Sequence, residues 1–283
     1  RVIDWYRRHG YDFVAITDHN RHYAPPPARE GDIVVLPGEE VTMAARGKPV
    51  HVNALCTTHT VGPAHFERRA DAVSWAVDQI RAQRGVALVN HPNFEWALEA
   101  RDIAAAPGAQ LIDIFNGHPH VHSAGDGKRP SVEAIWQTLL DQGSVLSPVA
   151  VDDAHAFTLV PLSGVPRSRP GTGWVGVFAD GRDARSICDA LAAGRTYASQ
   201  GPEVTRLRVQ GDELVLWTTS ADAVVRFIGP AGELLAEVSP QGGDGGERMA
   251  SYRLRGDELL VRARIDSPRG PAWTPAFRTR ATE

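Results

Sequence analysis

Histidines and carboxylates follow directly after short apolar runs at several places in this sequence. The segments are Thr17-Asp18-His19, Pro37-Gly38-Glu39-Glu40, Asn90-His91-Pro92 and Asp152-Asp153-Ala154-His155. An apolar, β-branched run predicts a buried strand, and α/β barrels place their chemistry at the C-terminal tips of such strands. One further histidine lies inside a strand-like run. The candidates for chemistry are therefore His19, Glu40, His51, His91, Asp153 and His155.

Imidazole and carboxylate groups in one set predict a site for divalent metal ions. Nitrogen and oxygen ligands of this kind suit Zn, Mn or Fe, and a carboxylate can bridge two ions. Such ions would acidify a bound water, giving a metal-bound hydroxide for hydrolysis. Neighbouring side chains of an extended segment face opposite ways, so one member of Glu39-Glu40 and one of Asp152-Asp153 is expected to be a bystander. A serine hydrolase is disfavoured because the sequence has no Gly-x-Ser-x-Gly motif.

The elements that must position these residues alternate between strands and helices up to about residue 200. This alternation predicts βα units around a mostly parallel sheet. Polar tips on many strands, without a Gly-rich phosphate loop, favour a closed barrel over a doubly wound sheet. Helices are expected at residues 2–9, 67–83, 94–105, 132–140 and 184–193, and strands at 11–16, 33–36, 49–55, 86–89, 111–115, 145–151 and 174–178.

The pattern changes near Gln200-Gly201-Pro202, where helical periodicity gives way to short alternating runs. Gly-rich turns such as residues 242–246 separate these runs. Alternation with turns of this kind predicts antiparallel strands. The expected domains are an α/β barrel over residues 1–202 and a small, sandwich-like antiparallel β domain over residues 203–283.

Composition excludes several classes of protein. The 283 residues are 42% hydrophobic and 23% charged with a net charge of −4, which is ordinary for a globular chain and gives no reason to expect nucleic-acid binding. No apolar stretch approaches the roughly 20 residues that span a bilayer. Cys56 and Cys188 are the only cysteines, so no disulfide framework is expected, and Cys56 is interpreted as a small buried hydrophobe. A soluble protein is expected, with the cytoplasm favoured; the oligomeric state is left open.

The ordered set of motifs resembles the PHP (polymerase and histidinol phosphatase) metallohydrolases over about residues 1–200. The segments that carry the resemblance are Thr17-Asp18-His19, Pro37-Gly38-Glu39-Glu40, His51, Asn90-His91-Pro92 and Asp153-Ala154-His155. Residues 194–202 and Ala272-Trp273-Thr274-Pro275 are similar to features of the CehA/McbA branch of that family, and they extend the resemblance into the β domain.

The resemblance implies a distorted (β/α)7 TIM-like barrel with two or three divalent ions, Mn, Zn or Fe, at its mouth. Glu40 would bridge two ions, and His51 and His91 would complete the shell of one. Asp153 would bind the ion that also takes the family's first motif, while His19 and His155 would share a third. Asp18 is expected to serve catalysis by orienting a ligand histidine. Arg21, Asn116, His118 and Arg195 are the candidates for holding a small anionic substrate.

One departure from the family is the absence of its opening His-x-His motif. His118-Pro119-His120-Val121-His122 has the spacing but follows a different strand, so a loop that contacts substrate is the preferred interpretation. The chain also begins within a helical pattern, from which we expect upstream sequence to be missing. The leading prediction is a metal-dependent phosphoesterase. The alternatives are a carbamate or amide hydrolase of CehA type and a non-catalytic, degenerate PHP-like module.

Overall fold

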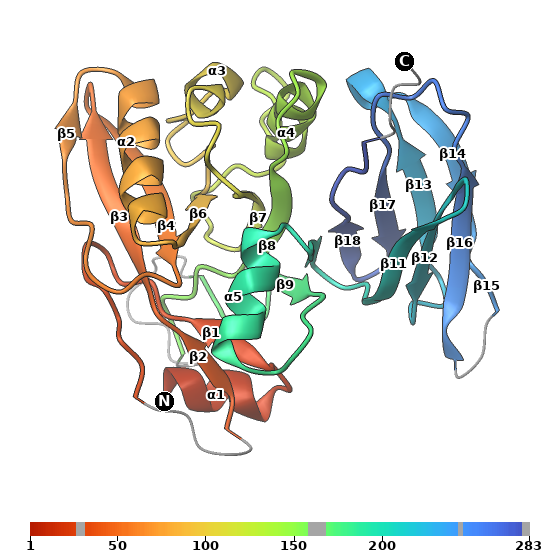
Figure 1. Cartoon of the computed structure of the whole chain (residues 1–283), viewed down its shortest axis with the longest axis horizontal. Helices are drawn as coiled ribbons and strands as arrows, with labels where there is room; N and C mark the ends of the chain where they lie inside the picture. The colour runs from red at the N-terminus through yellow and green to blue at the C-terminus, as the bar shows by residue number, and fades with distance from the viewer. Residues whose placement is uncertain (27–31, 158–167, 243–245, 279–283) are drawn as a thin grey trace.

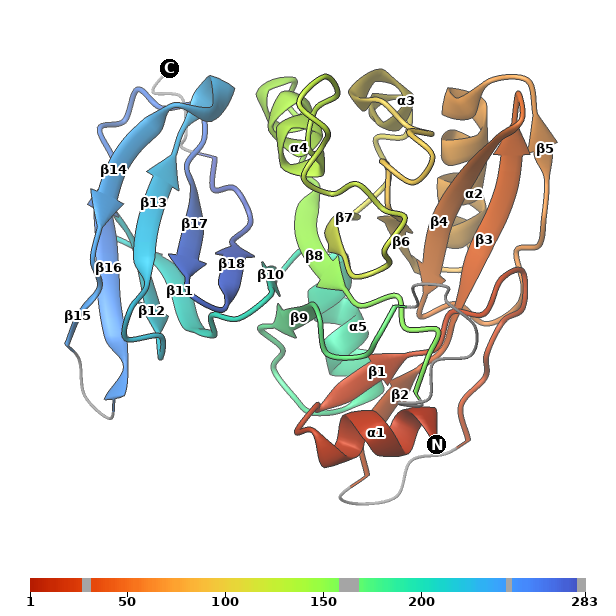
Figure 2. The same cartoon turned by 180° about the vertical axis from the view of Figure 1, so that it is seen from behind.

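The computed structural model describes residues 1–26, 32–157, 168–242 and 246–278. Figure 1 shows two parts side by side, and Figure 2 shows them from behind. In the red-to-green part helices lie against strands, whereas the blue part is built of strands.

The elements follow one another with few long connections. In the first part they are α1 (Val2–Arg8), β1 (Phe13–Ala15), β2 (Val34–Leu36), β3 (Gly38–Ala45), β4 (Lys48–Leu55), β5 (His65–Phe66), α2 (Arg69–Ala82), β6 (Val86–Val89), α3 (Ala100–Ala104), β7 (Leu111–Asn116), α4 (Val132–Asp141), β8 (Ser147–Val151), β9 (Trp174–Val177), α5 (Ala184–Ala192) and β10 (Thr196–Ser199). The second part holds β11 (Val204–Gln210), β12 (Glu213–Thr218), β13 (Val224–Ile228), the 3₁₀ turn η1 (Pro230–Gly232), β14 (Leu234–Val238), β15 (Gln241–Gly242), β16 (Arg248–Arg253), β17 (Arg262–Ser267) and β18 (Gly270–Trp273).

The prediction of a (β/α)7 barrel is wrong for this structure. In the described ranges there are five α-helices, and the strands fall into four sheets with mostly antiparallel pairing. The sheet that carries the helices has the order β5-β3-β4-β6-β7-β8. Strand β4 runs antiparallel to both β3 and β6, while β6, β7 and β8 are parallel. Only β6–β8 therefore follow the βα pattern that the sequence predicts throughout.

A hairpin between β3 and β4 is the main reason for the difference. Its turn residues Arg46 and Gly47 have φ values of 49° and 73°. Positive φ at both central residues is the requirement of the two-residue type I′ turn, which joins antiparallel strands directly. The strand after residue 36 consequently continues through Glu39 and Glu40, so these residues lie within a strand rather than after its tip.

Strands β1 and β2 form a separate parallel pair beside this sheet. Because only Pro37 separates β2 from β3, the pair remains attached to the larger sheet. The segment after β1 lies along the start of β3, where His19 and Glu40 form a parallel bridge. The amide of Glu40 donates to the carbonyl of Asp18 over 3.2 Å, and the amide of Asn20 donates to the carbonyl of Glu40 over 2.9 Å. These backbone contacts bring the first motif to the second.

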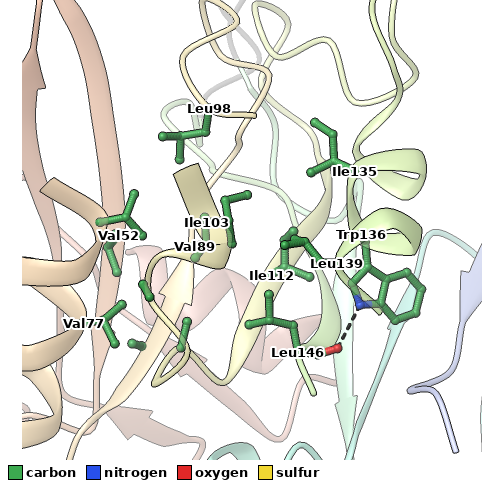
Figure 3. Packing of buried hydrophobic residues seen from close by; sticks show 14 of the residues in the cluster. Val52, Val77, Val89, Leu98, Ile103, Ile112, Ile135, Trp136, Leu139 and Leu146 are labelled. Carbon is green, nitrogen blue, oxygen red and sulfur yellow. Dashed lines mark hydrogen bonds between the residues drawn. The ribbon is translucent and has the colours of Figure 1, made fainter. Parts of the chain in front are cut away.

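Helices α2, α3 and α4 cover one face of the sheet and enclose its main core. Figure 3 shows Val52, Val77 and Ile112 among the side chains that meet there. Trp136 of α4 is fully buried, and its indole Nε1 donates to the carbonyl of Leu146 over 2.8 Å. The amphipathic α4 is thereby tied to the strand that follows it.

The other face of the sheet packs against α5. Leu88 and Leu111 cluster with Leu191 of α5, whereas their neighbours Val89 and Ile112 belong to the core under α2–α4. Alternate residues of a strand face opposite sides, so both faces of the central strands are apolar.

Two antiparallel sheets make up the C-terminal part, with a core between them. One has the order β11-β12-β16-β15 and the other β14-β13-β17-β18-β10-β9. The second sheet crosses the expected boundary at residue 202, because β10 pairs with β18. The division into domains 1–202 and 203–283 remains a prediction.

A disulfide joins Cys56 to Cys188, contrary to the sequence-based interpretation of Cys56 as a buried hydrophobe. Cys56 follows β4 and Cys188 lies on α5, 132 residues further along the chain, with a Cα–Cα distance of 6.1 Å. That distance is typical of disulfides.

None of the helices in the described ranges is long and apolar enough to cross a bilayer.

Candidate metal centre

Glu40 is the centre of a buried cluster of ionisable side chains. Its Oε1 lies 2.7 Å from Nδ1 of His51 and 3.1 Å from Nε2 of His91. The two ring nitrogens are 3.2 Å apart. All three residues are buried. Two imidazole nitrogens and one carboxylate oxygen thus converge on a single point.

The register of the β3–β4 hairpin explains this convergence. Glu40 pairs with Asn53 and Thr42 pairs with His51, so all four side chains face the same side of the hairpin. His91 follows β6, which pairs with β4. The φ angle of His91 is 23°, which is unusual for a residue other than glycine. His91 adopts it where β6 passes into the following loop.

His19 lies beside the second carboxylate oxygen of Glu40, and its ring meets that of His51 edge-on with centroids 5.4 Å apart. Its Nδ1 lies 3.5 Å from Oε2 of Glu40 and 2.5 Å from Oγ1 of Thr42. The ring of His19 is half exposed, unlike those of His51 and His91. The two carboxylate oxygens of Glu40 therefore face different histidines.

The charges of the cluster stabilise one another. Burial opposes ionisation of Glu40, but hydrogen bonds from His51 and His91 outweigh it and lower the pKa of the carboxyl below its ordinary value. Burial likewise opposes protonation of His91, but the hydrogen bond to Glu40 and that residue's charge raise the pKa of the imidazole. The carboxylate form of Glu40 is the form that binds a cation.

A second layer of polar residues, Asn90, Asp113 and Asn116, surrounds the cluster. Asn90 donates through Nδ2 to Oε1 of Glu40 over 3.0 Å. Asp113 accepts from the amide of His91 over 3.2 Å and from Nδ2 of Asn116 over 2.9 Å. Burial raises the pKa of Asp113 to about 7. Sequence reasoning missed Asp113, although a carboxylate inside the apolar run 111–115 was a signal for it.

Three oxygens in or beside this layer have no hydrogen-bond partner among the described residues. They are Oδ1 of Asn53, Oδ1 of Asn90 and Oδ1 of Asp113, all buried. A buried oxygen without a partner is unfavourable unless a donor or cation reaches it. This part of the interior is therefore polar and has more hydrogen-bond acceptors than donors among the described residues.

Asp153 and His155 lie on the loop after β8. Nδ1 of His155 donates to the carbonyl of Asp153 over 2.7 Å and lies 3.5 Å from its Oδ1. Since a carbonyl only accepts, Nδ1 carries the hydrogen and Nε2 is left as the free nitrogen. Asp152 lines the same cavity, and its Oδ2 accepts from the hydroxyl of Tyr6 over 2.8 Å and from the amide of Gly171 over 2.9 Å. These two bonds are consistent with Asp152 being the bystander of its pair, which stays a prediction.

These groups share one large cavity. It has a volume of about 1570 Å³, and His19, Glu40, Asp153 and His155 are among the residues that line it. The charge of Asp153 also contributes to raising the pKa of His91, which is consistent with their closeness. His19 and Glu40 therefore open onto the same space as Asp153 and His155, whereas His51 and His91 are not among its lining residues.

The candidate residues Asp18, Arg195 and Arg21 are all exposed, and they differ in their contacts. Asp18 is exposed and lines the cavity, while its carbonyl accepts from the backbone of Glu40. Arg195 is exposed and pairs with Asp180 at 3.1 Å. Arg21 is exposed, and its backbone amide donates to the carbonyl of Asp18. Neither arginine is brought to the cluster by a described contact.

Asn116 and His118 lie at the end of β7, near the cluster. Oδ1 of Asn116 accepts from the amide of His118 over 2.7 Å. The ring of His118 packs against that of His155, with centroids 5.5 Å apart. Burial lowers the pKa of His118 below its ordinary value.

The donor set fits a divalent transition ion. One ligand atom from each of His19, Glu40 and His51 lies within 4.8 Å of the others. Imidazole nitrogen and carboxylate oxygen are common ligands of Zn²⁺, Mn²⁺ and Fe²⁺. His91 offers a further nitrogen to the same carboxylate. These residues can supply the ligands of a cation once the ring nitrogens lose the protons that they share with Glu40.

Comparison with known proteins gives little beyond this geometry. No family model matches the chain, and no curated protein matches it. Among solved structures, a two-domain protein from Bacteroides vulgatus, "containing predicted PHP-like metal-dependent phosphoesterase", aligns with 98% of this chain and 89% of its own. The identity is 13% and the TM-score 0.46. A likeness this distant carries no argument about the function of the present chain.

Proposed function

We propose that this chain is a metal-dependent hydrolase of phosphoesters, related to the PHP metallohydrolases and within them to the CehA/McbA branch. The observation that carries the proposal is the carboxylate of Glu40, whose Oε1 lies near His51 and His91 and whose Oε2 lies near His19. A buried carboxylate between imidazoles is a typical site for a cation. The ligands would be His19, Glu40, His51, His91, Asp153 and His155.

The proposed centre holds two or three ions, Mn, Zn or Fe. Oε1 of Glu40 faces His51 and His91, whereas Oε2 faces His19, so a bridging role for Glu40 fits this arrangement. Asp153 and His155 stand at the same cavity and would complete the set. When bound, the ions would polarise the substrate and lower the pKa of a coordinated water.

The chain's own residues would prepare this chemistry in three ways. Asn90 fixes the orientation of the Glu40 carboxylate, and hydrogen bonds from His51 and His91 keep it ionised before a cation replaces their protons. Asp113 fixes the backbone of His91. The bond from His155 to the carbonyl of Asp153 leaves Nε2 of His155 available. Preorganised ligands of this kind raise metal affinity because little order is lost on binding.

A carbamate or amide hydrolase is the second candidate, and the positions of the arginines favour it. Arg195 is exposed and paired with Asp180, and Arg21 is exposed. A phosphomonoester carries about two negative charges at neutral pH and is commonly held by converging cations. A neutral carbamate or amide does not require them.

Hydrolysis by the chelator-stripped and reloaded protein tests the proposal. We expect release of nitrophenol from 4-nitrophenyl phosphate after addition of Mn²⁺ or Zn²⁺, and none without metal. Faster turnover of 1-naphthyl N-methylcarbamate would favour the second candidate. Metal-loaded protein that cleaves neither substrate would count against both, and favour the non-catalytic module.

A further inference from the structure

We propose that His118 donates a hydrogen bond through Nε2–H to an oxygen of the substrate, and that the backbone of His120 fixes the ring in this form. The inference rests on the proposed function, since it assigns a residue that contacts the substrate of the same site. It is carried by hydrogen bonds within the loop after β7.

The loop that carries His118 is braced against the loop after β6. The ring of His122 stacks on Trp96 with parallel planes and centroids 4.7 Å apart, and the guanidinium of Arg129 lies 4.3 Å from the centroid of the Trp96 ring. Nδ2 of Asn93 donates to the carbonyls of His122 and Pro130, each over 2.9 Å. His122 therefore has a structural role, and the loop holds its neighbours in place.

His118 itself is fixed at two points. Its amide donates to Oδ1 of Asn116, which in turn donates through Nδ2 to the buried Asp113. Its ring nitrogen Nδ1 accepts from the amide of His120 over 3.3 Å. A backbone amide can only donate, so Nδ1 has no hydrogen and the neutral ring carries its hydrogen on Nε2.

The ring of His118 stands beside the proposed centre. Its centroid is 6.1 Å from that of Phe94, and Phe94 contacts the rings of His91 and His51 at 5.2 Å and 6.0 Å. On its other side lies His155, at 5.5 Å. The ring of Phe94 therefore lies between His118 and the candidate ligands His51 and His91. The ring of His118 contacts that of the third candidate ligand, His155, directly.

Nε2 of His118 has no hydrogen-bond partner within the part of the chain that the structure describes, although the ring is partly buried. A partly buried N–H donor without a protein partner can bind an acceptor without first breaking another hydrogen bond within the chain. The acceptor that fits is an oxygen of a phosphoryl group bound at the centre. Arg195, another candidate for this oxygen, already pairs with Asp180.

Nitrogen NMR of the full chain tests the ring form directly. The zinc-loaded protein would be labelled with ¹⁵N-histidine and recorded at pH 8, and the signals of His118 assigned from their loss in His118→Gln. We expect a neutral ring with the hydrogen on Nε2. A hydrogen on Nδ1 would overturn the inference whatever the activity of the enzyme.

Binding of inorganic phosphate to the zinc-loaded protein tests the contact. We expect His118→Phe, which keeps a ring but has no donor, to bind phosphate about tenfold more weakly, the effect of losing one hydrogen bond to a charged group. His118→Gln retains an N–H donor and should recover part of the affinity. The matched control is His122→Phe, which preserves the stack on Trp96 and should bind like the wild type.

The possible outcomes separate this inference from the proposed function. If wild type and His118→Phe bind phosphate and hydrolyse ester equally well, His118 has no such contact and the proposed function stands. If the wild type neither binds phosphate nor cleaves ester, both fail. Weaker binding by His118→Phe alone, with Nε2–H in the spectra, would support the inference.

Discussion

Glu39 and Glu40 are consecutive residues, and their carboxylates are held on opposite sides of β3. Glu39 accepts from the amides of Val61 and Gly62 over 2.8 Å and 3.0 Å. Glu40 faces His51 and His91. Both are buried, so the direction of each side chain decides its environment. Glu39 stabilises the connection after β4, and Glu40 forms the proposed centre.

Glu39→Gln is therefore expected to lower the free energy of unfolding by about 1–2 kcal/mol, because it weakens two hydrogen bonds to a buried carboxylate. Its metal binding should be unchanged. Urea unfolding followed by circular dichroism measures the first effect, and metal titration the second. Wild-type stability in this variant would show that the Val61 and Gly62 contacts contribute nothing.

Glu258 gives a pH dependence that is independent of the metal site. Burial opposes its ionisation, but hydrogen bonds from the Tyr252 hydroxyl and from the amides of Arg255 and Gly256 outweigh this and lower the pKa to about 2. A carboxyl whose pKa is lower in the folded state stabilises the fold above its unfolded pKa, and this contribution is lost as the pH falls. We expect Glu258→Gln to be less stable than the wild type at pH 7, with the difference shrinking between about pH 4.5 and pH 2.

Thermal unfolding at a series of pH values measures this difference. The control is Glu233→Gln, at an exposed position. A gap between Glu258→Gln and the wild type that stays constant down to pH 2 would argue against the lowered pKa.

The Cys56–Cys188 disulfide should contribute to stability. Removing a native disulfide typically costs about 2–5 kcal/mol, since it releases a long loop in the unfolded chain. We expect the double variant Cys56→Ala/Cys188→Ala, and the wild type in dithiothreitol, to unfold at similarly lowered temperatures. If dithiothreitol lowered the unfolding temperature of the double variant as well, the effect would not come from this bond.

A buried ion pair should hold α4 against the C-terminal sheets. Arg262 is almost fully buried, and its guanidinium donates to Glu133 over 2.9 Å and to Gln137 over 2.8 Å. Removing one partner of a buried pair leaves an unpaired charge, so Glu133→Ala should cost about 3 kcal/mol. The double variant Glu133→Ala/Arg262→Met should recover part of this loss in urea unfolding. Equal stability of the single and double variants would contradict the argument.

Local features were the most predictable from sequence. The helix predicted at residues 132–140 is found at Val132–Asp141, and it is capped by Ser131, whose Oγ accepts from the amide of Ala134 over 3.1 Å. The strands predicted at residues 86–89 and 111–115 are found at Val86–Val89 and Leu111–Asn116. Their apolar runs are short and bounded by turn residues, which makes the ends of the strands predictable. These signals depend only on neighbours in the chain.

Features that depend on pairing distant segments were not predictable. No strand was predicted over residues 38–45, but β3 forms there and the Arg46-Gly47 turn pairs it antiparallel with β4, which the barrel prediction did not allow for. The helix expected at residues 94–105 shrinks to Ala100–Ala104, because Glu95 and Trp96 have positive φ in the loop that stacks on His122. The disulfide depends on a contact across 132 residues. Disulfides are more typical of oxidising compartments, so the cellular location is still a prediction to be tested.

Isothermal titration of the chelator-stripped chain with Zn²⁺ or Mn²⁺ tests the central claim most directly. The wild type is expected to bind at least one ion tightly, and Glu39→Gln to do the same. Glu40→Gln should lose binding at both sites that Glu40 is proposed to bridge. Less than one ion bound per wild-type chain, or unchanged binding in Glu40→Gln, would contradict a metal centre built on Glu40.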